Sequence, residues 1–428
     1  MQQKTWLILL ANLLWAFLPI AVVQLFQTYS VFIIFLLRFF FGGLSILLTG
    51  IILTLFYQRK HPEVNLRVLG KYLRSYNPNY RHLSQFGYFT IVGGIGFTIH
   101  ICFFFFSIKF LGVLVTVIGF PLALILVSIF SKETMDFFKS VYLGVLVIAI
   151  ILIGVGRIEV AEANLADPSG WLALILFTVS LTVMMNQMAK DPLHPWETQL
   201  IIQGNKHYRI VRMLTKIGII FLMSAAFVFP LTGVMLLLPP DSLFQQEAVK
   251  FYSQLGSLGV LFLTWQGLFL IFGATVACYL LLFSAEAYWP RSALPFDTWS
   301  SILSIVEPTA SVVFGVLILN EAFPPNYLFI VVLLLALSII LRYVHETTNK
   351  VIAYIALKVV PQRDKEVIQD LFHIKAIQSI ASVVGDYDLV LFIQASNIVA
   401  FNKLVNKKLK GHPDIEEVRE FLVEEVIK

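Results

Sequence analysis

Hydrophobic residues fill most of the chain, and near Arg342 their pattern changes. Up to that point long apolar stretches alternate with short polar loops. From Val351 to Lys428 charged residues are frequent, and apolar residues recur at the periods of strands and helices. The sequence therefore predicts two domains of different kinds, at about 1–345 and 351–428.

The apolar stretches are long enough to cross a membrane, which takes about 20 helical residues. Ten stretches reach this length, at about 5–27, 31–57, 86–107, 110–131, 138–156, 169–190, 215–238, 258–284, 297–319 and 325–344. The first is longer than the apolar core of a signal peptide, which has about 7 to 15 residues, so we expect it to remain as a span. The fold class predicted for this part is an all-α polytopic membrane bundle.

The composition supports this class. Hydrophobic residues make up 58% of the 428 residues and charged residues 13%, and the mean hydropathy is +0.83. Soluble proteins have about a quarter of their residues charged. Cys102 and Cys278 lie in apolar stretches, without CxxC spacing or nearby histidine clusters. We therefore expect a multi-pass protein of the plasma or inner cell membrane, with no disulfide framework, metal site or cofactor.

Basic residues are distributed unequally between the two sets of loops. If the N-terminus is inside, the inside loops hold Arg59, Lys60, Arg67, Lys71, Arg74, Arg81, Lys132, Lys139, Lys190, Lys206, Arg209, Arg212, Lys216 and Arg291. The outside loops hold only Lys109, Arg157 and Lys250. Because Lys and Arg are retained on the cytoplasmic side, both termini are predicted to be cytoplasmic. This bias explains the net charge of +5 without a nucleic-acid partner.

One motif recurs in the two halves of the ten-span part. The peptide PLALILVSIFSKE begins at Pro121, and PTASVVFGVLILNE begins at Pro308. Both end in a glutamate, Glu133 or Glu321. Each half, at about 1–160 and 165–345, contains five spans. Because five is odd, the second half enters the membrane from the opposite side, which predicts inverted repeats with a binding site between them.

Several segments together resemble the drug/metabolite transporter superfamily of the EamA type. They are LLWAF around Trp15, FLLRFFFGG around Arg38, the two Pro-to-Glu peptides, and GVLVIAIILIGVG from Gly144 to Gly156. The resemblance covers about residues 5 to 345. It implies a secondary transporter that exports a small metabolite.

Charged residues within the spans are candidates for the transport site. Ionisable groups in hydrocarbon cost about 2.5 to 3.5 kcal/mol, so they face the protein interior or a water-filled cavity. Arg38, Glu286 and Glu307 are the main candidates. Glu307 directly precedes Pro308, and a proline leaves a backbone carbonyl without its helical donor. Glu307 therefore belongs either to a substrate or proton site or to a packing pair with Arg38.

Uncharged and weakly basic groups form a second set of candidates. His100 titrates in a range suited to proton relay, although a single histidine on an apolar helix more often only packs. Gln24, Asn186 and Gln266 can line a polar cavity or bridge neighbouring helices. The cluster of Gly93, Gly94 and Gly96 lies within a span, so it predicts close helix packing and no phosphate loop.

The C-terminal segment predicts a ferredoxin-like α+β fold. AYIALKVV reads as a strand, and a helical apolar stripe with Val367 and Leu371 follows Pro361. Two strands joined at Gly385 come next, then a helix that ends at Gly411. A last strand over Val418 to Val426 completes the order βαββαβ.

Three peptides of this segment resemble the effector-binding domain of the Lrp/AsnC family of feast/famine regulators. They are AYIALKVVP, VVGDYDLVLFI and KGHPDIEEV, and the resemblance covers nearly all of residues 351–428. It implies a dimerising module that binds amino acids or related effectors where subunits meet, near Gly385, Asp386, Tyr387 and Asp388. The helix-turn-helix DNA reader of that family is absent, so the resemblance implies no nucleic-acid binding.

The residues themselves leave two interpretations of this turn open. Asp386 and Asp388 can accept hydrogen bonds from a ligand ammonium group, or they can simply cap the hairpin. The exposed edge of such a sheet is also a pairing surface, and it predicts a homodimer.

Together these patterns favour a secondary transporter of a small metabolite, such as an amino acid or derivative, with a cytoplasmic effector-sensing domain. The alternative is a membrane-anchored small-molecule sensor or scaffold without transport activity. No GxxxxGK[ST] motif is present, so transport energy has to come from a gradient. We expect no enzyme activity, because no paired acids, metal-ligand spacing or nucleophile constellation occurs in the sequence.

Overall fold

The computed structural model describes residues 4–78, 80–130, 137–160, 168–188, 193–194, 196–197, 200, 206–289, 296–348, 351–395 and 398–422. The chain divides into two compact units. We call Met1–Ile340 the helical body and Leu341–Lys428 the C-terminal module.

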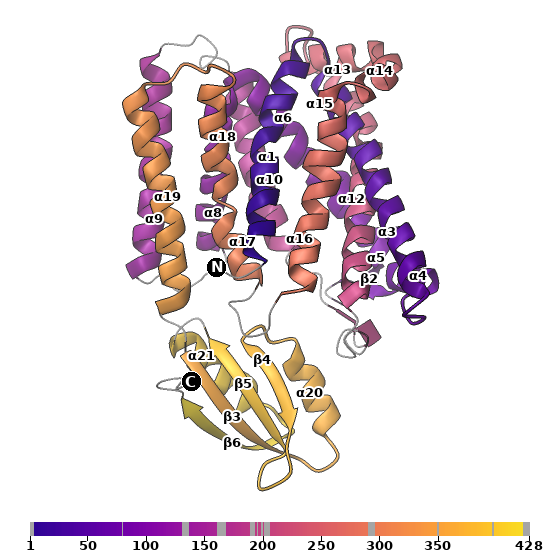
Figure 1. Cartoon of the computed structure of the whole chain (residues 1–428), viewed down its shortest axis with the longest axis vertical. Helices are drawn as coiled ribbons and strands as arrows, with labels where there is room; N and C mark the ends of the chain where they lie inside the picture. Colours follow the sequence, from indigo (N-terminus) through magenta and orange to yellow (C-terminus); the bar gives the residue numbers. More distant parts are fainter. Residues whose placement is uncertain are drawn as a thin grey trace. The chain divides into compact units, whose positions relative to one another are not determined.

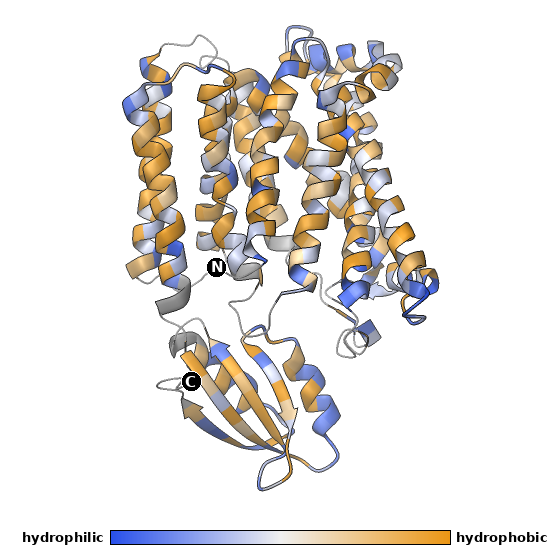
Figure 2. Ribbon diagram, viewed as in Figure 1, coloured by the Kyte–Doolittle hydropathy of each residue, from blue (hydrophilic) through white to orange (hydrophobic). Residues whose placement is uncertain are grey.

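Ten helices of the described chain are long and apolar enough to cross a membrane. They are Thr5–Phe26, Val31–Gln58, Gln85–Leu111, Val113–Phe130, Phe137–Glu159, Pro168–Met185, Lys206–Met235, Trp265–Ala287, Trp299–Leu317 and Pro325–His345. Their number and order confirm the predicted fold class. Hydrophobic residues predominate along the helices of the helical body (Figure 2), and many large ones are exposed; Ile52, Phe130 and Phe329 are 64%, 67% and 71% exposed. Such a surface suits a lipid environment.

Five of these ten spans are assembled from shorter elements (Figure 1). In chain order, the first five spans are α1 (Thr5–Phe26), α2-η1-α3 (Val31–Leu36, Leu37–Phe41, Gly42–Gln58), α5-η2-α6 (Gln85–Ile91, Val92–Phe97, Thr98–Leu111), α7-α8 (Val113–Val117, Gly119–Phe130) and α9 (Phe137–Glu159). The next five are α10 (Pro168–Met188), α12 (Lys206–Met235), α15-η5-α16 (Trp265–Leu268, Phe269–Ala277, Cys278–Ala287), α17-α18 (Phe296–Leu303, Val306–Leu317) and α19 (Pro325–Thr348). The segments η1, η2 and η5 are π-helical.

Shorter elements connect some of the spans. They are α4 (Leu66–Arg74), the hairpin of β1 (Tyr76–Asn77) and β2 (Tyr80–Ser84), α13 (Leu243–Ser253), η4 (Leu255–Ser257) and α14 (Leu258–Phe262). The predicted start of the eighth span, near residue 258, is therefore wrong, because that stretch forms α14. The span begins at Trp265, where the side chain of Thr264 accepts a hydrogen bond from Gly267 N and caps a new helix.

Equivalent spans of the two halves make equivalent contacts. The first helix of the second half, α10, packs against α6 and α8, from the third and fourth spans of the first half. Correspondingly, α1 packs against α16 and α18, from the third and fourth spans of the second half. The second spans, α3 and α12, pack against each other. Reciprocal packing of this kind is expected for two inverted repeats.

Both repeats also interrupt their fourth span near the recurring proline. The first half breaks between α7 and α8, and Pro121 is the third residue of α8. The second half breaks between α17 and α18, and Pro308 is the third residue of α18. A missing backbone N–H is tolerated there, because first-turn N–H groups have no partner within the helix. The repeated motif thus marks two discontinuous spans.

Small residues allow close packing between spans. A Cβ built on Gly93 meets the backbone of Ile220 in α12, and one built on Gly43 lies 2.9 Å from the Cβ of Phe221. Gly94 similarly faces the ring of Phe227. The glycines of the third span are therefore packing residues, as their position within an apolar stretch indicates.

The C-terminal module has the predicted order βαββαβ. Its elements are β3 (Val351–Val359), α20 (Asp364–Phe372), β4 (Ile377–Ser382), β5 (Leu389–Ala395), α21-η6 (Ile398–Leu404, Val405–Leu409) and β6 (Ile415–Leu422). The strands form one antiparallel sheet in the order β4-β5-β3-β6, as in a ferredoxin-like fold. The last strand begins three residues before its predicted start at Val418, where it pairs with the end of β3.

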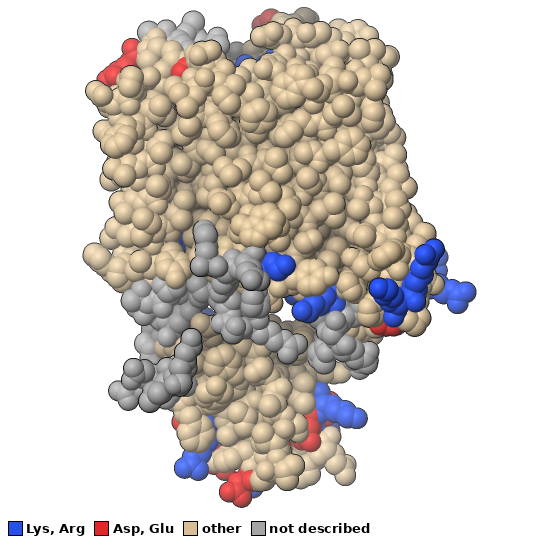
Figure 3. Space-filling view, viewed as in Figure 1, with Lys and Arg blue, Asp and Glu red and all other residues tan. Residues whose placement is uncertain are grey.

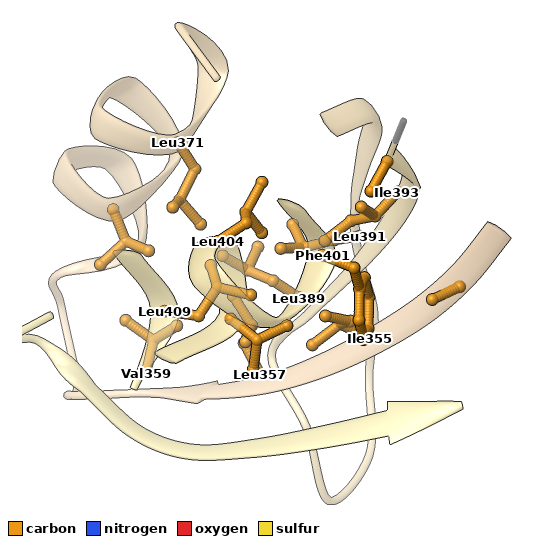
Figure 4. Close-up of a cluster of buried hydrophobic side chains, with 14 residues drawn as sticks. Ile355, Leu357, Val359, Leu371, Leu389, Leu391, Ile393, Phe401, Leu404 and Leu409 are labelled. Atoms are coloured by element: carbon orange, nitrogen blue, oxygen red, sulfur yellow. The ribbon is translucent and has the colours of Figure 1, made fainter. Parts of the chain in front are cut away.

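The core of the module lies between this sheet and its helices. Alternate residues of β3 and β5, including Ile355, Leu357, Leu391 and Ile393, point to the same side (Figure 4). They pack against Leu371 of α20 and against Phe401 and Leu409 of the second helical segment. Burial of this alternating set explains why the strand pattern was readable from the sequence.

Candidate functional site

Glu307 lies in the first turn of α18, about halfway along the ninth span. It directly follows the break between α17 and α18, and its side chain is half-buried. Among the described residues it makes no ion pair within 4.0 Å, although its charge interacts with that of Arg38. The carboxylate is thus placed deep in the helical body without a direct salt bridge to hold it.

Arg38 is fixed by the opposite repeat. It lies in η1 and is 5% exposed. Its Nε donates to the hydroxyl of Thr275 at 3.2 Å, and an Nη lies 3.5 Å from the carbonyl oxygen of Ala274. The guanidinium also lies 5.3 Å from the ring centre of Phe39. Arg38 therefore bridges η1 to η5.

Aromatic side chains pack beside the η5 segment that holds Arg38. Trp15 of α1 donates its Nε1 hydrogen to the carbonyl oxygen of Ala274 at 2.9 Å. The ring of Tyr279 lies 5.6 Å from that of Trp15 and 5.5 Å from that of Phe221. The charges of Arg38 and Glu307 both act on Tyr279. A polar and aromatic cluster therefore forms where α1, η1, η5, α16 and α18 meet.

His100 packs mainly on aromatic rings. It is 8% exposed and stacks on Phe177 with ring centres 5.2 Å apart, and the ring of Phe97 lies edge-on at 5.9 Å. Its Nδ1 has no hydrogen-bond partner among the described residues. The charge of Arg38 acts on the imidazole. The geometry agrees with the packing role weighed from the sequence and places His100 beside the central cluster.

The remaining predicted polar residues are not part of this cluster. Gln266 Nε2 donates to Gln24 Oε1 at 3.1 Å, and the pair is exposed, so it bridges α15 and α1. Asn186 is a residue of α10, and its side chain lies outside the described part. Glu286 forms an ion pair with Arg209 near the end of the eighth span. Of the sequence candidates, Glu307 and His100 each lie within electrostatic range of Arg38.

Sequence reasoning missed a buried ionic cluster at the other end of the body. Glu247 of α13 is 7% exposed, forms an ion pair with Lys109, and accepts a hydrogen bond from Val31 N at 2.8 Å. Burial and the Lys109 ammonium lower the pKa of Lys250, against the opposing effect of Glu247. The signal was available, because Glu247 is one of few acids in the loops of that end, but only tertiary packing placed it at the start of α2.

Glu321, the last residue of the second recurring peptide, caps a helix. Its carboxylate accepts hydrogen bonds from Val113 N at 2.6 Å and Leu114 N at 3.0 Å. The helix that it caps is α7 of the other repeat, preceded by Gly112 at φ 83. Its sequence counterpart Glu133 lies outside the described residues, as do Lys132, Lys190 and Arg291.

In the C-terminal module, two of the predicted turn residues, Tyr387 and Asp388, make hydrogen bonds within the module, whereas Gly385 and Asp386 are exposed. Asp388 Oδ2 accepts from Val359 N at 2.8 Å, so this acid fixes the strand ends. The Tyr387 hydroxyl donates to Glu417 at 2.9 Å, and Tyr387 also raises the pKa of Arg419. Asp386 is exposed.

Gly385 adopts φ 154, which favours glycine, and a Cβ there would meet nothing within 4 Å. The turn is therefore open to a ligand or partner on its Gly385–Asp386 side.

Comparison with known proteins identifies one part of the chain. No curated protein and no solved structure matched the sequence. Residues 352–428 match the family model of the Lrp/AsnC ligand binding domain. The matched range agrees with the βαββαβ unit found in the structure. The C-terminal module is therefore similar to an Lrp/AsnC ligand binding domain, and it is carried on a body of ten helices fit to span a membrane.

Proposed function

We propose that this protein is a secondary transporter of a small metabolite, such as an amino acid or derivative, regulated by effector binding to its C-terminal module. The observation that carries the proposal is the position of Glu307, midway along the discontinuous ninth span and within electrostatic range of Arg38 in the second span of the other repeat. Broken helices at the interface of inverted repeats are the usual site of substrate and ion binding in transporters. The resemblance of the body to EamA-type transporters supports the same function and favours export.

The geometry of the cluster suits a zwitterionic or proton-coupled substrate. Arg38 offers a fixed positive charge, because the π-helix η5 holds its guanidinium. Glu307 offers a carboxylate that either binds an ammonium group or carries a proton. Trp15 and Tyr279 supply aromatic walls for the apolar part of a substrate. No catalytic role is assigned to these residues.

The proposed orientation places both termini in the cytoplasm. Fourteen basic residues occupy the loops of one side against three on the other. Lys and Arg side chains gather at the end of the helical body from which α4 extends (Figure 3). Of the three on the opposite end, Lys109 is ion-paired and Arg157 is 2% exposed. Burial is not limited to that end, because Lys139 and Lys216 of the other side are 5% and 3% exposed, so the orientation rests on the number of basic residues.

We propose that the module also dimerises, through the helix-free face of its sheet. Phe392, Tyr354 and Phe421 are register neighbours across β5, β3 and β6 on that face. Tyr354 and Phe421 are each 48% exposed, and the rings of Tyr354 and Phe392 lie 5.2 Å apart. An exposed aromatic row across three strands is a surface that a second copy can bury. This replaces the sheet edge, favoured by the sequence, with the sheet face.

Counterflow in proteoliposomes tests the transport proposal. Purified protein is reconstituted into liposomes that are loaded with a mixture of unlabelled amino acids. Uptake of each labelled amino acid is then measured and compared with uptake by liposomes without protein. We expect saturable uptake of at least one, sensitive to a proton gradient. Deletion of residues 351–428 is expected to retain uptake but to remove its response to an added amino-acid effector. Uptake equal to that of empty liposomes for the whole panel would contradict transport of amino acids.

A sensor or scaffold without transport is the second candidate. The match of residues 352–428 to a ligand binding domain favours this candidate, because ligand binding by the module does not require the body to transport anything. Thermal unfolding of the full-length protein with the same amino acids separates the two. Ligand-dependent stabilisation without any flux supports the sensor, and stabilisation with flux supports the regulated transporter.

A further inference from the structure

One side of α4 carries a row of basic residues. Arg67, Lys71 and Arg74 are spaced by four and three residues, so they lie on one face of the helix, and all three are exposed. The opposite face carries the buried residues Leu69 and Tyr72. No acidic residue occurs in α4. The helix therefore presents a uniformly positive face away from its packing surface.

This basic face is hollowed into a groove. An open depression of about 620 Å³ on this face is lined by Leu66, Arg67, Gly70, Lys71, Arg74 and Ser75. Gly70 lies within the basic row, and a Cβ built there would meet nothing within 4 Å. The absence of a side chain at position 70 is thus what leaves space between the three cations.

Neighbouring aromatic groups help to set the orientation of the groove. The Lys71 ammonium lies 4.4 Å from the ring centre of Trp196. On the buried face, the guanidinium of Arg212 lies 4.5 Å from the ring centre of Tyr72. These contacts fix α4 on both of its sides, so the groove lies on a helix with a defined orientation.

The position of α4 in the chain favours a lipid as the occupant. α4 lies between the end of the second span at Gln58 and the start of the third at Gln85, and it contacts α3. The outer face of α3 carries Leu48, Ile52 and Leu55, which are 48%, 64% and 50% exposed, and Arg59 continues the same stripe. An apolar stripe that ends in cations is expected where acyl chains give way to headgroups.

We propose that the α4 groove binds the phosphate of an anionic lipid headgroup, with the acyl chains along the exposed face of α3. Arg67, Lys71 and Arg74 would contact the phosphate oxygens, and Leu66, which is 43% exposed, would contact the glycerol and upper acyl region. Basic residues next to a span attract anionic lipids by about 1 kcal/mol each. The groove adds a defined site to that general attraction.

Native mass spectrometry of the full-length protein tests this site. Delipidated protein is titrated with phosphatidylglycerol and with phosphatidylcholine of identical acyl chains. We expect one retained phosphatidylglycerol with at least about a fivefold preference, because a preference of that size requires only a fraction of the attraction available from three cations. The triple variant Arg67→Gln, Lys71→Gln, Arg74→Gln is expected to lose the preference. A matched triple variant in the module, Lys403→Gln, Lys407→Gln, Lys408→Gln, removes the same charge and is expected to keep it.

Gly70→Leu distinguishes a groove from a diffuse positive surface. It fills the space between the cations without changing any charge, and the open surroundings of Gly70 allow it to fold, which thermal unfolding verifies. We expect retention of phosphatidylglycerol to fall at least about threefold, because the leucine side chain occupies the space proposed for the phosphate. Equal retention by wild type and Gly70→Leu, or no preference in the wild type, overturns the proposal. Displacement of the lipid by millimolar inorganic phosphate also overturns it, because it identifies a site for a free anion.

Discussion

The two halves of the helical body break their fourth span at equivalent places but fill the break differently. In the second half the residue before the proline is Glu307, and in the first half it is Phe120. Phe120 packs edge-on against Phe104 and Phe177, at 5.7 and 5.4 Å between ring centres. One break is therefore closed by aromatic packing, while the other holds a carboxylate that interacts with Arg38. Both repeats share the broken backbone, and only the second has an ionisable residue directly before its proline.

The largest difference in transport is expected between substitutions of Glu307 and of Phe120, the residues that precede the two prolines. Glu307→Gln keeps the size of the side chain but removes its charge, so we expect counterflow to fall at least about tenfold and to lose its dependence on a proton gradient, as for removal of a group essential to binding. Phe120→Leu preserves an apolar break and is expected to retain both properties. Proteoliposome counterflow over a range of pH measures the flux and its pH dependence for both variants. Unchanged flux and pH dependence in Glu307→Gln would falsify the assignment of the carboxylate.

Arg38 provides the next contrast, between function and stability. In Arg38→Gln the former partners stay satisfied, because Thr275 donates to Leu270 O at 2.7 Å and Ala274 O accepts from Trp15. We expect flux to fall about tenfold, as for loss of one charged contact of about 1.5–3 kcal/mol, with little change in thermal unfolding. Arg209→Gln, which breaks the pair with Glu286 near the end of a span, serves as control. A flux loss in Arg38→Gln that merely follows a loss of folded protein contradicts a role in binding.

Two glycines of the helical body differ in how closely they are packed against neighbouring helices. In Gly93→Ala the new methyl group collides with the backbone of Ile220, so we expect a destabilisation of about 1–3 kcal/mol. In Gly144→Ala nothing lies within 4 Å of the methyl group, and helix propensity favours alanine by about 0.5–1 kcal/mol. Thermal unfolding in detergent compares the two. Equal unfolding temperatures exclude a close contact between η2 and α12.

The smallest difference in stability and ligand response is expected between substitutions of two acids of the module, Asp388 and Asp386. Asp388→Ala leaves the buried N–H of Val359 without its acceptor, at a cost of about 1–3 kcal/mol. Asp386 is exposed, and Asp386→Ala is expected to leave unfolding unchanged while it weakens any effector-induced stabilisation. Differential scanning fluorimetry with and without an amino-acid panel reports both quantities. Effector stabilisation that survives in Asp386→Ala moves the ligand site away from the turn.

Much of the fold was readable because each part obeys one dominant periodicity. Apolar length determined the ten spans, and two-residue alternation in β3 and β5 determined the buried face of the module. The start of the eighth span was misplaced because α14 is as apolar as the span that follows. Only the Thr264 cap separates them, and a single polar residue gives little signal in a hydrophobic stretch.

The candidate site was less predictable. Glu307 and Arg38 were identifiable because charge is rare in a span, but the partners of Arg38 come from η5, more than 200 residues away in the chain. The only signal for the buried acid Glu247 was the small number of acids in the loops of that end, and loop acids are ordinarily solvated. Contacts between distant segments depend on the packing of the repeats, which local patterns do not encode.

The sequence by itself determined the membrane character of the body, the five-plus-five arrangement suggested by the recurring Pro-to-Glu peptide, and the strand and helix order of the module. It did so because burial in lipid or in a core imposes length and period on the chain. Only the tertiary structure decided that Arg38 binds η5, that Glu321 caps a helix of the opposite repeat, and that Glu247 joins Lys109. A hydrogen bond or ion pair depends on two positions at once, and packing brings those two positions together.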